Sequence, residues 1–410
     1  MNIWIFNHYA ITPKSSGGTR HFDLAKELVN KNYNVKIFAS SFEHHGASDT
    51  NIINPKEKVR IESVDDIQFV WIKTCQYKKN DFKRVWNILG YTFRAFLTAI
   101  KTKEKPDVII GSLMHPPAAL LGYIISKIKG SKFYFEERDL WPQTLIDLGK
   151  VSKRNPIVKL LSWLEIFLYK KSDRIIILFK NAVNYIEGKG ISKEKVLVLP
   201  NGVDIKRFDN AKELPNDLDV FINSKLKDHF KAIYIGSHGM SDNLEPLLLT
   251  AKKLKEKNSK VCLLFFGKGP EKERLIKFKE EEKLENVIFF PSVAKEYIPK
   301  LLESCDVGLL SMHNAELYKW GMSFNKMYDY TAAELPIVVN STMKVGDLDD
   351  FGSIVWAQNP VEMAESLDSL SLNKSLCDKL GANGKRYLEK NFNWEMLSQK
   401  LVTVLEQDLK

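Results

Sequence analysis

Lys326 and Asp329 are the residues whose types and spacing most directly suggest chemistry. They lie in the stretch SFNKMYDYTAAELPIVV, which covers residues 323–339. Ser323 can cap a helix that ends before Leu335-Pro336, after which a short apolar strand follows. Residues three apart share a helix face, and the positive end of a helix attracts phosphate. The spacing predicts a phosphate-binding pair, but an exposed ion pair on an ordinary helix fits it equally well.

A glycine pair near the N-terminus offers backbone groups to an anion. An apolar strand at 2–6 is followed by Gly17-Gly18, by an amphipathic helix whose apolar stripe begins at Phe22, and by a strand at 35–39. This order predicts a βαβ unit, in which ligands bind beyond the carboxyl ends of the strands. Gly17 and Gly18 let the backbone approach such a ligand, or they form a tight turn without one. No G-x-G-x-x-G is present, so the dinucleotide fingerprint is absent.

Polar residues follow two further strands in the first half of the chain. His115 comes after a strand at 107–111, and Glu137-Arg138-Asp139 come after a strand at 132–136. Because neighbouring parallel strands end at the same edge of a sheet, these side chains are expected close together. A local Arg138–Asp139 ion pair that holds a loop is the alternative.

The second half repeats the alternation of strands and helices. Strands, each followed by a helix, are expected at 232–235, 261–266, 287–290 and 307–310. Gly236 ends the first of them, and Gly267-Lys268 ends the second. The fold class expected is α/β, with two doubly wound Rossmann-like domains that face each other across a cleft.

The domain boundaries follow from the same patterns. The polar stretch 206–228 lacks a sustained apolar period and is the expected linker. We expect a first domain at 1–205 and a second at 206–389. The last helices, from about 374 to 409, are long enough to cross back, so 390–410 is assigned to the first domain.

Composition limits the classes of function. The chain has 410 residues and a formal net charge of +10, which favours an anionic partner. The four cysteines are far apart, which indicates neither a zinc site nor a disulfide framework and fits a reducing cytoplasm. No leader and no apolar run near the roughly 20 residues of a bilayer span is recognised. Nucleic-acid-binding signatures are also absent, so a nucleic-acid partner is not expected.

The stretch 78–103 is expected to form a long helix with aromatic, aliphatic and basic residues together. Trp86 and Phe93 lie among Lys83, Arg84 and Arg94. Such a mixture suits a helix on an anionic membrane surface. A helix packed on its own sheet with its basic face in water is the alternative, and both can hold.

In this order, the motifs resemble those of retaining glycosyltransferases of family four, with the GT-B fold. The resemblance covers essentially the whole chain. It rests on Gly17-Gly18, PNGVD from 200 to 204, the strand end at Gly236, FGKGP from 266 to 270 and the stretch 323–339. ERDLWP, at 137–142, further resembles the subgroup that adds amino sugars to lipid-linked intermediates of bacterial capsule and O-antigen.

Two departures from the family pattern concern the donor site. Many members carry two glutamates eight residues apart in the C-terminal stretch, whereas here Gly321 stands at the first position and Asp329 at the second. The first acidic role is absent or moved to Glu316. The basic pair often seen after the first strand of the C-domain is also missing, and Lys326 is the nearest replacement, with Lys268 second.

The resemblance implies a role for each domain. The C-domain would bind a nucleotide-sugar donor, for which the resemblance favours UDP as the nucleotide. Asp329 would accept hydrogen bonds from the ribose. Lys326 would neutralise the diphosphate as a catalytic group. Further donor contacts are expected from Ser323, Phe324, Asn325, Gly236, Gly267, Lys268, Gly17 and Gly18.

The N-domain would bind a lipid-linked or saccharide acceptor. The resemblance places the catalytic candidates Arg138, Asp139 and His115 at its side. Arg20 or Lys14, together with Glu137, would bind the acceptor. No metal and no cofactor is expected, because lysine and backbone groups can stabilise the phosphate, and Asp347-Leu348-Asp349 is interpreted as loop charge.

Two rival functions are consistent with the residues. A UDP-sugar epimerase shares a related two-domain fold and would need no acceptor. A catalytically silent scaffold on the membrane would explain Gly321 at the position of the first glutamate.

The expected location of the protein is the cytoplasm, where it would attach peripherally to the inner face of the cell membrane.

Overall fold

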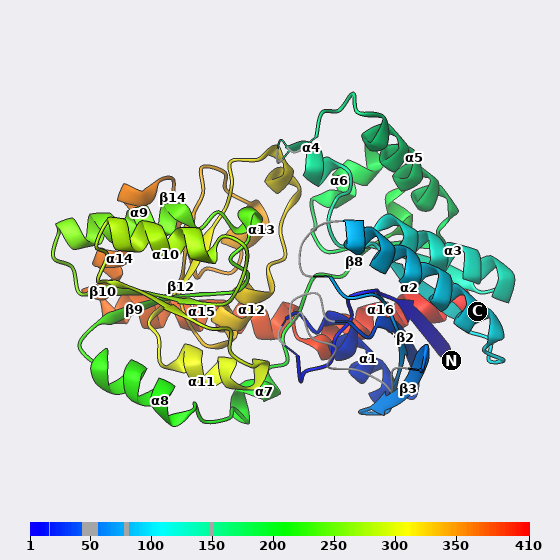
Figure 1. Cartoon of the computed structure of the whole chain (residues 1–410), viewed down its shortest axis with the longest axis horizontal. Helices are drawn as coiled ribbons and strands as arrows, with labels where there is room; N and C mark the ends of the chain where they lie inside the picture. The colour runs from blue at the N-terminus through cyan, green and yellow to red at the C-terminus, as the bar shows by residue number, and fades with distance from the viewer. Residues whose placement is uncertain (16, 43–55, 78–81, 148, 150) are drawn as a thin grey trace. The chain divides into compact units, whose positions relative to one another are not determined.

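The chain folds into two compact α/β units in the computed structural model (Figure 1), which describes residues 1–15, 17–42, 56–77, 82–147, 149 and 151–410. Unit 1 comprises Met1–Pro200 and Trp394–Lys410, and unit 2 comprises Asn201–Asn393. The first boundary lies five residues before the one expected at 205. The returning segment begins at Trp394 instead of 390.

Unit 1 contains an eight-stranded sheet in the order β3-β4-β2-β1-β5-β6-β7-β8. Its strands are β1 (Asn2–Phe6), β2 (Asn34–Ser40), β3 (Val59–Val64), β4 (Ile67–Ile72), β5 (Val108–Ser112), β6 (Lys132–Glu137), β7 (Arg174–Ile177) and β8 (Val196–Val198). Its helices are α1 (Arg20–Asn30), α2 (Phe82–Lys101), α3 (Pro116–Lys129), α4 (Gln143–Asp147), α5 (Pro156–Lys171), α6 (Ala182–Glu187) and α16 (Trp394–Leu409). The strand pairs are parallel except for the antiparallel pair β3–β4.

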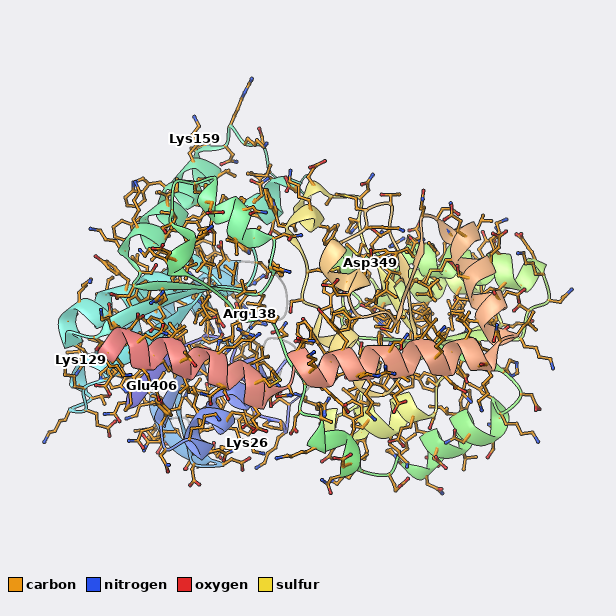
Figure 2. All side chains as sticks on the ribbon, turned by 180° about the vertical axis from the view of Figure 1, so that it is seen from behind. Lys26, Lys129, Arg138, Lys159, Asp349 and Glu406 are labelled. Carbon is orange, nitrogen blue, oxygen red and sulfur yellow. The ribbon has the colours of Figure 1, made fainter. Side chains whose placement is uncertain are left out.

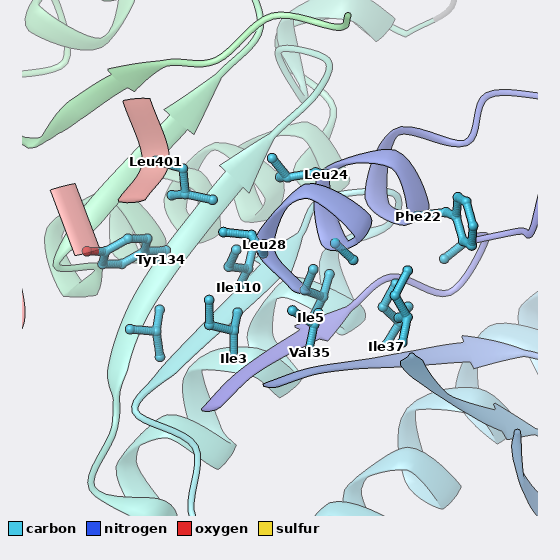
Figure 3. Packing of buried hydrophobic residues seen from close by; sticks show 14 of the residues in the cluster. Ile3, Ile5, Phe22, Leu24, Leu28, Val35, Ile37, Ile110, Tyr134 and Leu401 are labelled. Atoms are coloured by element: carbon cyan, nitrogen blue, oxygen red, sulfur yellow. The ribbon is translucent and has the colours of Figure 1, made fainter. Parts of the chain in front are cut away.

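Alternate side chains of β1 point to opposite faces of this sheet. Ile3 and Ile5 pack with α1 and α16, as the close view of this core shows (Figure 3). Trp4 and Phe6 pack with α2 and α3 on the other face. Full burial of such a side chain contributes about 1.5–3 kcal/mol, so both faces need a helix layer.

Unit 2 contains a six-stranded parallel sheet in the order β11-β10-β9-β12-β13-β14. Its strands are β9 (Phe230–Ile235), β10 (Val261–Phe266), β11 (Val287–Phe290), β12 (Val307–Ser311), β13 (Ile337–Asn340) and β14 (Ile354–Ala357). Its helices are α7 (Lys206–Asp209), α8 (Asn216–Asp219), α9 (Glu245–Glu256), α10 (Lys272–Glu281), α11 (Ile298–Glu303), α12 (Asn325–Ala332), α13 (Gly346–Asp349), α14 (Pro360–Ser371) and α15 (Lys374–Asn391). Helices α9 and α14 cover one face, and α11 lies on the other (Figure 1).

The strand order reverses once in each sheet. In unit 1 the reversal lies between β1 and β5, and in unit 2 between β9 and β12. Ligands of doubly wound sheets bind beyond the carboxyl ends of the strands at such a point. The ends of β1, β5 and β9 are therefore the places where functional side chains are expected.

Three expectations from the sequence are wrong or incomplete. The segment 206–228 is not a linker, because it belongs to unit 2 and buries Leu214, Ile222 and Leu226. The hairpin β3–β4 was not predicted. The expected helix at 78–103 is described from Phe82 to Lys101, and residues 78–81 and the side chain of Asp347 lie outside what the structure describes.

Candidate donor site and the side chains at the strand ends

Helix α12 is fixed on the sheet of unit 2 by Tyr330. A Cβ atom at Gly308 in β12 would lie 2.4 Å from the Tyr330 ring, so glycine makes room for the ring. The Tyr330 hydroxyl accepts a hydrogen bond from the Ile235 N–H at 2.8 Å, at the end of β9. Lys326 lies one turn earlier on the same face of α12. The contact of Tyr330 thus brings Lys326 to the end of β9.

The Lys326 ammonium is held by two side chains of unit 2. Its Nζ donates to the Tyr234 hydroxyl at 2.5 Å and to Asp242 Oδ1 at 3.0 Å, and it lies 4.1 Å from the centroid of the Tyr234 ring. Burial lowers the pKa of Lys326, and the attraction of Asp242 offsets this only in part. Within the described chain, two of its three N–H groups have partners, so one can bind an anion.

Gly236 brings backbone close to the Lys326 ammonium, and Gly267 packs against Gly236. Gly236 and Gly267 follow β9 and β10 with φ of 148° and 150°, a region that favours glycine. A Cβ at position 236 would lie 2.9 Å from Lys326 Nζ, and one at 267 would lie 1.8 Å from the Gly236 carbonyl oxygen. The two strand ends therefore require glycine. Lys268 is exposed, and its carbonyl accepts from the His238 N–H at 3.0 Å.

His238 is fully buried beside these glycines. The centroid of its ring lies 6.0 Å from that of the Tyr234 ring and 5.8 Å from that of the Phe289 ring. Neither ring nitrogen has a hydrogen-bond partner among the described residues. Burial, with a smaller contribution from the charge of Lys272, lowers the pKa of His238 to about 4. The ring is therefore neutral at neutral pH.

Asp329 does not pair with Lys326. Its Oδ1 accepts from the guanidinium of Arg207 in α7, which lies in the segment that the sequence assigned to the linker. Nε and Nη1 of Arg207 are buried and have no partner within the described part of the chain. The simple surface pair between Lys326 and Asp329 is thus excluded, since each binds a residue far away in the sequence.

Ser323 has a different local role from the one predicted. Helix α12 begins at Asn325, so Phe324 occupies the N-cap position and no side chain caps the helix. The Ser323 hydroxyl accepts from the Asn201 N–H at 3.0 Å, and the Ser323 carbonyl accepts from the Asn201 side chain at 2.7 Å. Ser323 as the N-cap is therefore wrong, because its hydroxyl already holds the PNGVD segment.

The other residues around α12 differ in exposure. The Phe324 ring centroid lies 5.8 Å from Lys326 Nζ, and Asn325 is exposed at the first turn. Gly321 is buried with φ of 113°. Glu316, the alternative carrier of the missing carboxylate, is exposed and bound to Lys319 at 2.9 Å.

In unit 1, Arg20 is part of a buried network. Its guanidinium binds Glu136 at 2.8 Å and the carbonyls of Leu199 and Pro200 at 2.8 and 2.6 Å. His21 binds the other oxygen of Glu136 at 2.6 Å. Burial alone would raise the pKa of Glu136, but His21 and Arg20 together lower it. Because protein groups bind Arg20 in this way, we do not retain it as an acceptor ligand.

His115 caps α3 and is bound to a second histidine. Its Nδ1 accepts from the Ala118 N–H at 3.2 Å, and its Nε2 lies 2.6 Å from His8 Nδ1. Burial, and then the charge of Arg84, lowers the pKa of His115 to about 3. A neutral ring whose Nδ1 accepts must carry its proton on Nε2, so His115 donates to His8.

The residues after β6 separate into buried and exposed groups. Glu137 is buried and accepts from the Tyr169 hydroxyl, and burial together with the charge of Glu165 raises its pKa well above the usual value. Arg138 Nη1 lies 3.4 Å from Met114 Sδ, and Asp139 is exposed. Glu137 is thus an internal group, whereas Asp139 is accessible to a ligand.

The remaining candidates are surface groups. Lys14, Gly17 and Gly18 are exposed, and Gly17 has φ of 137°. Across the part of the chain that the structure describes, no group of three or more His, Cys, Asp or Glu residues could hold a metal ion.

Sequence reasoning missed the partners that hold the candidate residues. Tyr234 and Asp242 hold Lys326, Arg207 holds Asp329, and His8 binds His115. No spacing signal connects these residues to their partners. A search for helical periodicity that assigned the segment around Arg207 to a folded unit could have identified Arg207 as a candidate partner.

Two family models match the chain, one in each half. The model of Glycosyltransferase Family 4 matches residues 16–207, and the model of Glycosyl transferases group 1 matches residues 216–387. Among curated relatives, the chain is 25% identical over 236 residues to the putative colanic acid biosynthesis glycosyl transferase WcaI of Escherichia coli, which is 56% of each protein. It is 25% identical over 324 residues to the probable glycosyltransferase WbjE of Pseudomonas aeruginosa, 74% of this chain and 76% of WbjE. The match thus spans little more than half the length of WcaI.

Solved structures share the architecture. Sucrose-phosphate synthase of Thermosynechococcus elongatus superposes with a TM-score of 0.75 at 14% identity, over 99% of this chain and 98% of that one. Anabaena HepE, solved with UDP and glucose, superposes with a TM-score of 0.70 at 14% identity, over 99% and 100%. These likenesses confirm the predicted fold class. With the two family models, which together cover both halves, they show that the chain belongs to the GT-B-fold glycosyltransferases.

Proposed function

We propose that the chain is a retaining transferase of hexosyl or N-acetylhexosaminyl groups from a UDP-linked donor to a lipid-linked or saccharide acceptor. The observation that carries the proposal is the partly buried Lys326 ammonium beside Gly236, at the strand-order reversal of unit 2. Burial lowers the pKa of Lys326 although Asp242 raises it, so the charge of the ammonium is only partly compensated. A further anionic group beside it would therefore be favourable. HepE was solved with UDP and glucose, which supports the same donor class here.

In this proposal, unit 2 binds the donor. Lys326 neutralises the charge that develops on the diphosphate as the sugar leaves. Asp329 accepts from the ribose hydroxyls, because a carboxylate bound to Arg207 through one oxygen keeps the other oxygen for a ligand. Gly236, Gly267 and the first N–H groups of α12 add backbone contacts, and Gly17, Gly18 and Lys268 remain candidate donor contacts.

The proposed acceptor groups belong to unit 1. Asp139 is exposed at the end of β6, and Lys14 is exposed in the loop after β1. The acceptor hydroxyl forms the new glycosidic bond as the bond to the diphosphate breaks, and its proton passes to the leaving phosphate. His115 acts through His8 by holding its tautomer, and Glu137 and Arg138 support the β6 end.

A bacterial surface polysaccharide is the proposed product. This rests on the names of WcaI and WbjE and on the ERDLWP resemblance. Peripheral attachment to the inner membrane face would bring the enzyme to a lipid-linked acceptor, and the exposed apolar residues of α2 support such attachment.

Product analysis with labelled UDP-sugars tests the proposal. Incubation with donor and an extract of lipid-linked saccharides should give labelled glycolipid with retained anomeric configuration, whereas donor alone should give no isomerised sugar. An isomerised UDP-sugar without acceptor would make the chain an epimerase. If the native chain binds no UDP-sugar, and Asp329→Asn gives the same result in the binding measurement, the chain would be a silent scaffold.

A further inference from the structure

Three helices of unit 1 expose large apolar side chains. They are Phe82, Val85, Trp86, Leu89, Phe93, Leu97 and Ile100 in α2, Ile124 and Ile128 in α3, and Ile157, Leu160 and Trp163 in α5. The two tryptophans are 59% and 61% exposed. We refer to these twelve residues as the three-helix surface.

The apolar residues of α2 form one stripe along the helix. They recur every three or four positions, and the buried residues Asn87, Tyr91, Ala95 and Ala99 occupy the opposite side. A Cβ atom at Gly90, on the exposed side, would meet nothing within 4 Å. Helix α2 therefore packs on unit 1 through one face and presents the apolar stripe on the other.

Helix α3 lies between α2 and α5 and contacts both. Lys129 Nζ, at the end of α3, donates to the Thr102 carbonyl after α2 at 2.6 Å. The rings of Tyr123 in α3 and Phe167 in α5 meet edge to face, with centroids 5.3 Å apart. The outward sides of the three helices are therefore neighbours in one layer.

The charged residues of the three helices are basic with one exception. The three helices contain nine lysines and arginines, and Glu165 is their single acidic residue. Glu165 is buried and bound to Lys189 and the Tyr185 hydroxyl. The exposed lysines of the helices are Lys83, Lys101, Lys127, Lys159, Lys170 and Lys171. Lys159 is labelled at the outer end of unit 1 in Figure 2.

Not every basic residue of α2 belongs to this surface. Arg94 donates to the Lys73 carbonyl and is only partly exposed. A charge reversal at Arg94 would therefore perturb the fold of unit 1, and it is unsuitable for testing membrane binding.

We infer that the three-helix surface docks unit 1 on a bilayer that contains anionic lipids. This inference deepens the membrane attachment in the proposed function by adding α3 and α5 to α2. Lysines at the edges attract the lipid phosphates, while tryptophan and aliphatic side chains enter the headgroup boundary. A protein partner is a poorer match, because lysine is depleted in protein interfaces. Within the described chain, no helix is long and apolar enough to cross a membrane.

Flotation with vesicles tests the inference on the full-length chain. We expect binding to vesicles of phosphatidylglycerol and phosphatidylcholine, and binding weakened at least about tenfold on pure phosphatidylcholine or in high salt. Leu160→Glu with Trp163→Glu should weaken binding to the anionic vesicles at least about tenfold. The matched control is Leu372→Glu in unit 2, where Leu372 is 84% exposed, and it should bind as the native chain does.

Two further variants keep the test decisive if the chain with Leu160→Glu and Trp163→Glu does not fold. Lys159→Glu with Lys170→Glu should lower vesicle binding by about fivefold or more per residue. Trp163→Phe should reduce the quenching of protein fluorescence by brominated lipid. Unchanged flotation of the α5 variants would overturn the inference. So would a native chain that does not bind vesicles and instead forms a dimer through α5. UDP binding is measured separately on each variant, so failure of the docking surface is distinguished from failure of the proposed activity.

Discussion

At the scale of single residues, the chemistry of the candidate donor site depends on how Lys326 is held. Tyr234 and Asp242 fix its ammonium, and burial lowers its pKa. A bound diphosphate would raise that pKa again, because an opposite charge favours the charged form. In the proposed site, the position of the Lys326 ammonium is therefore already fixed before an anionic ligand binds.

Replacement of Lys326 by alanine should reduce turnover by roughly 100-fold or more, the loss expected when one preorganised charge contact to a transition state is removed. The initial rate of sugar transfer at saturating acceptor measures this. Lys319→Ala is the control, since Lys319 is an exposed lysine shortly before α12 that pairs with Glu316. A near-native rate for Lys326→Ala would remove this residue from the site.

His238 should make the fold sensitive to acid. Its pKa is about 4 in the folded chain and about 6.5 in the unfolded chain, so the unfolded chain takes up a proton first as pH falls. Stability from burial of the neutral ring is present above pH 6.5 and is lost toward pH 4. The loss between pH 7 and pH 5 is of the order of 2 kcal/mol. Urea midpoints at pH 7 and 5 should therefore differ less in His238→Phe than in the native chain. His229→Phe, at an exposed position of unit 2, should leave the difference unchanged; equal differences in all three proteins would count against the assignment.

The sequence selected the residues of the candidate site but not the side chains that hold them. Lys326 and Asp329 were selected by spacing and resemblance, yet Asp242 and Arg207 lie 84 and 122 residues away from them. Such pairs depend on the order of strands in the sheet, which local spacing does not encode. Ser323 shows the same limit, because it is a suitable N-cap whose hydroxyl is already bound by Asn201.

At the scale of elements, the ends of β9 and β10 set the shape of the candidate donor site. The Gly236 carbonyl lies where a side chain at position 267 would begin, so the two strand ends approach each other only because residue 267 is glycine. The strands themselves were predicted from apolar runs, and their glycines from position alone. The close approach of the two loops required the structure.

Gly267→Ala should destabilise the chain by more than about 3 kcal/mol, because both the positive φ and the overlap with the Gly236 carbonyl must be relieved. Gly90→Ala is the matched substitution in a helix interior with open space, and it should stabilise by about 0.5–1 kcal/mol. Urea unfolding of both variants checks the signs. A stable Gly267→Ala chain with native UDP binding would contradict the geometry proposed for this loop.

At the scale of the whole molecule, the alternation of strands and helices was sufficient to predict two doubly wound units and a returning C-terminal helix. Helix α16 belongs to unit 1, where Asp408 binds Arg174 at 2.6 Å and the Tyr134 hydroxyl at 2.6 Å. The hairpin β3–β4 and the folded nature of 206–228 were missed. Strands β3 and β4 have six residues each and helices α7 and α8 have four each, and elements this short give weak periodic signals.

The central claim, that unit 2 binds the nucleotide diphosphate of the donor through Lys326, is tested most directly by calorimetric titration with UDP. The account predicts binding by the native chain and by Lys319→Ala, and an affinity at least tenfold lower, or ~1.4 kcal/mol, for Lys326→Ala. Lack of UDP binding by the native chain, or equal affinity in Lys326→Ala, would contradict it.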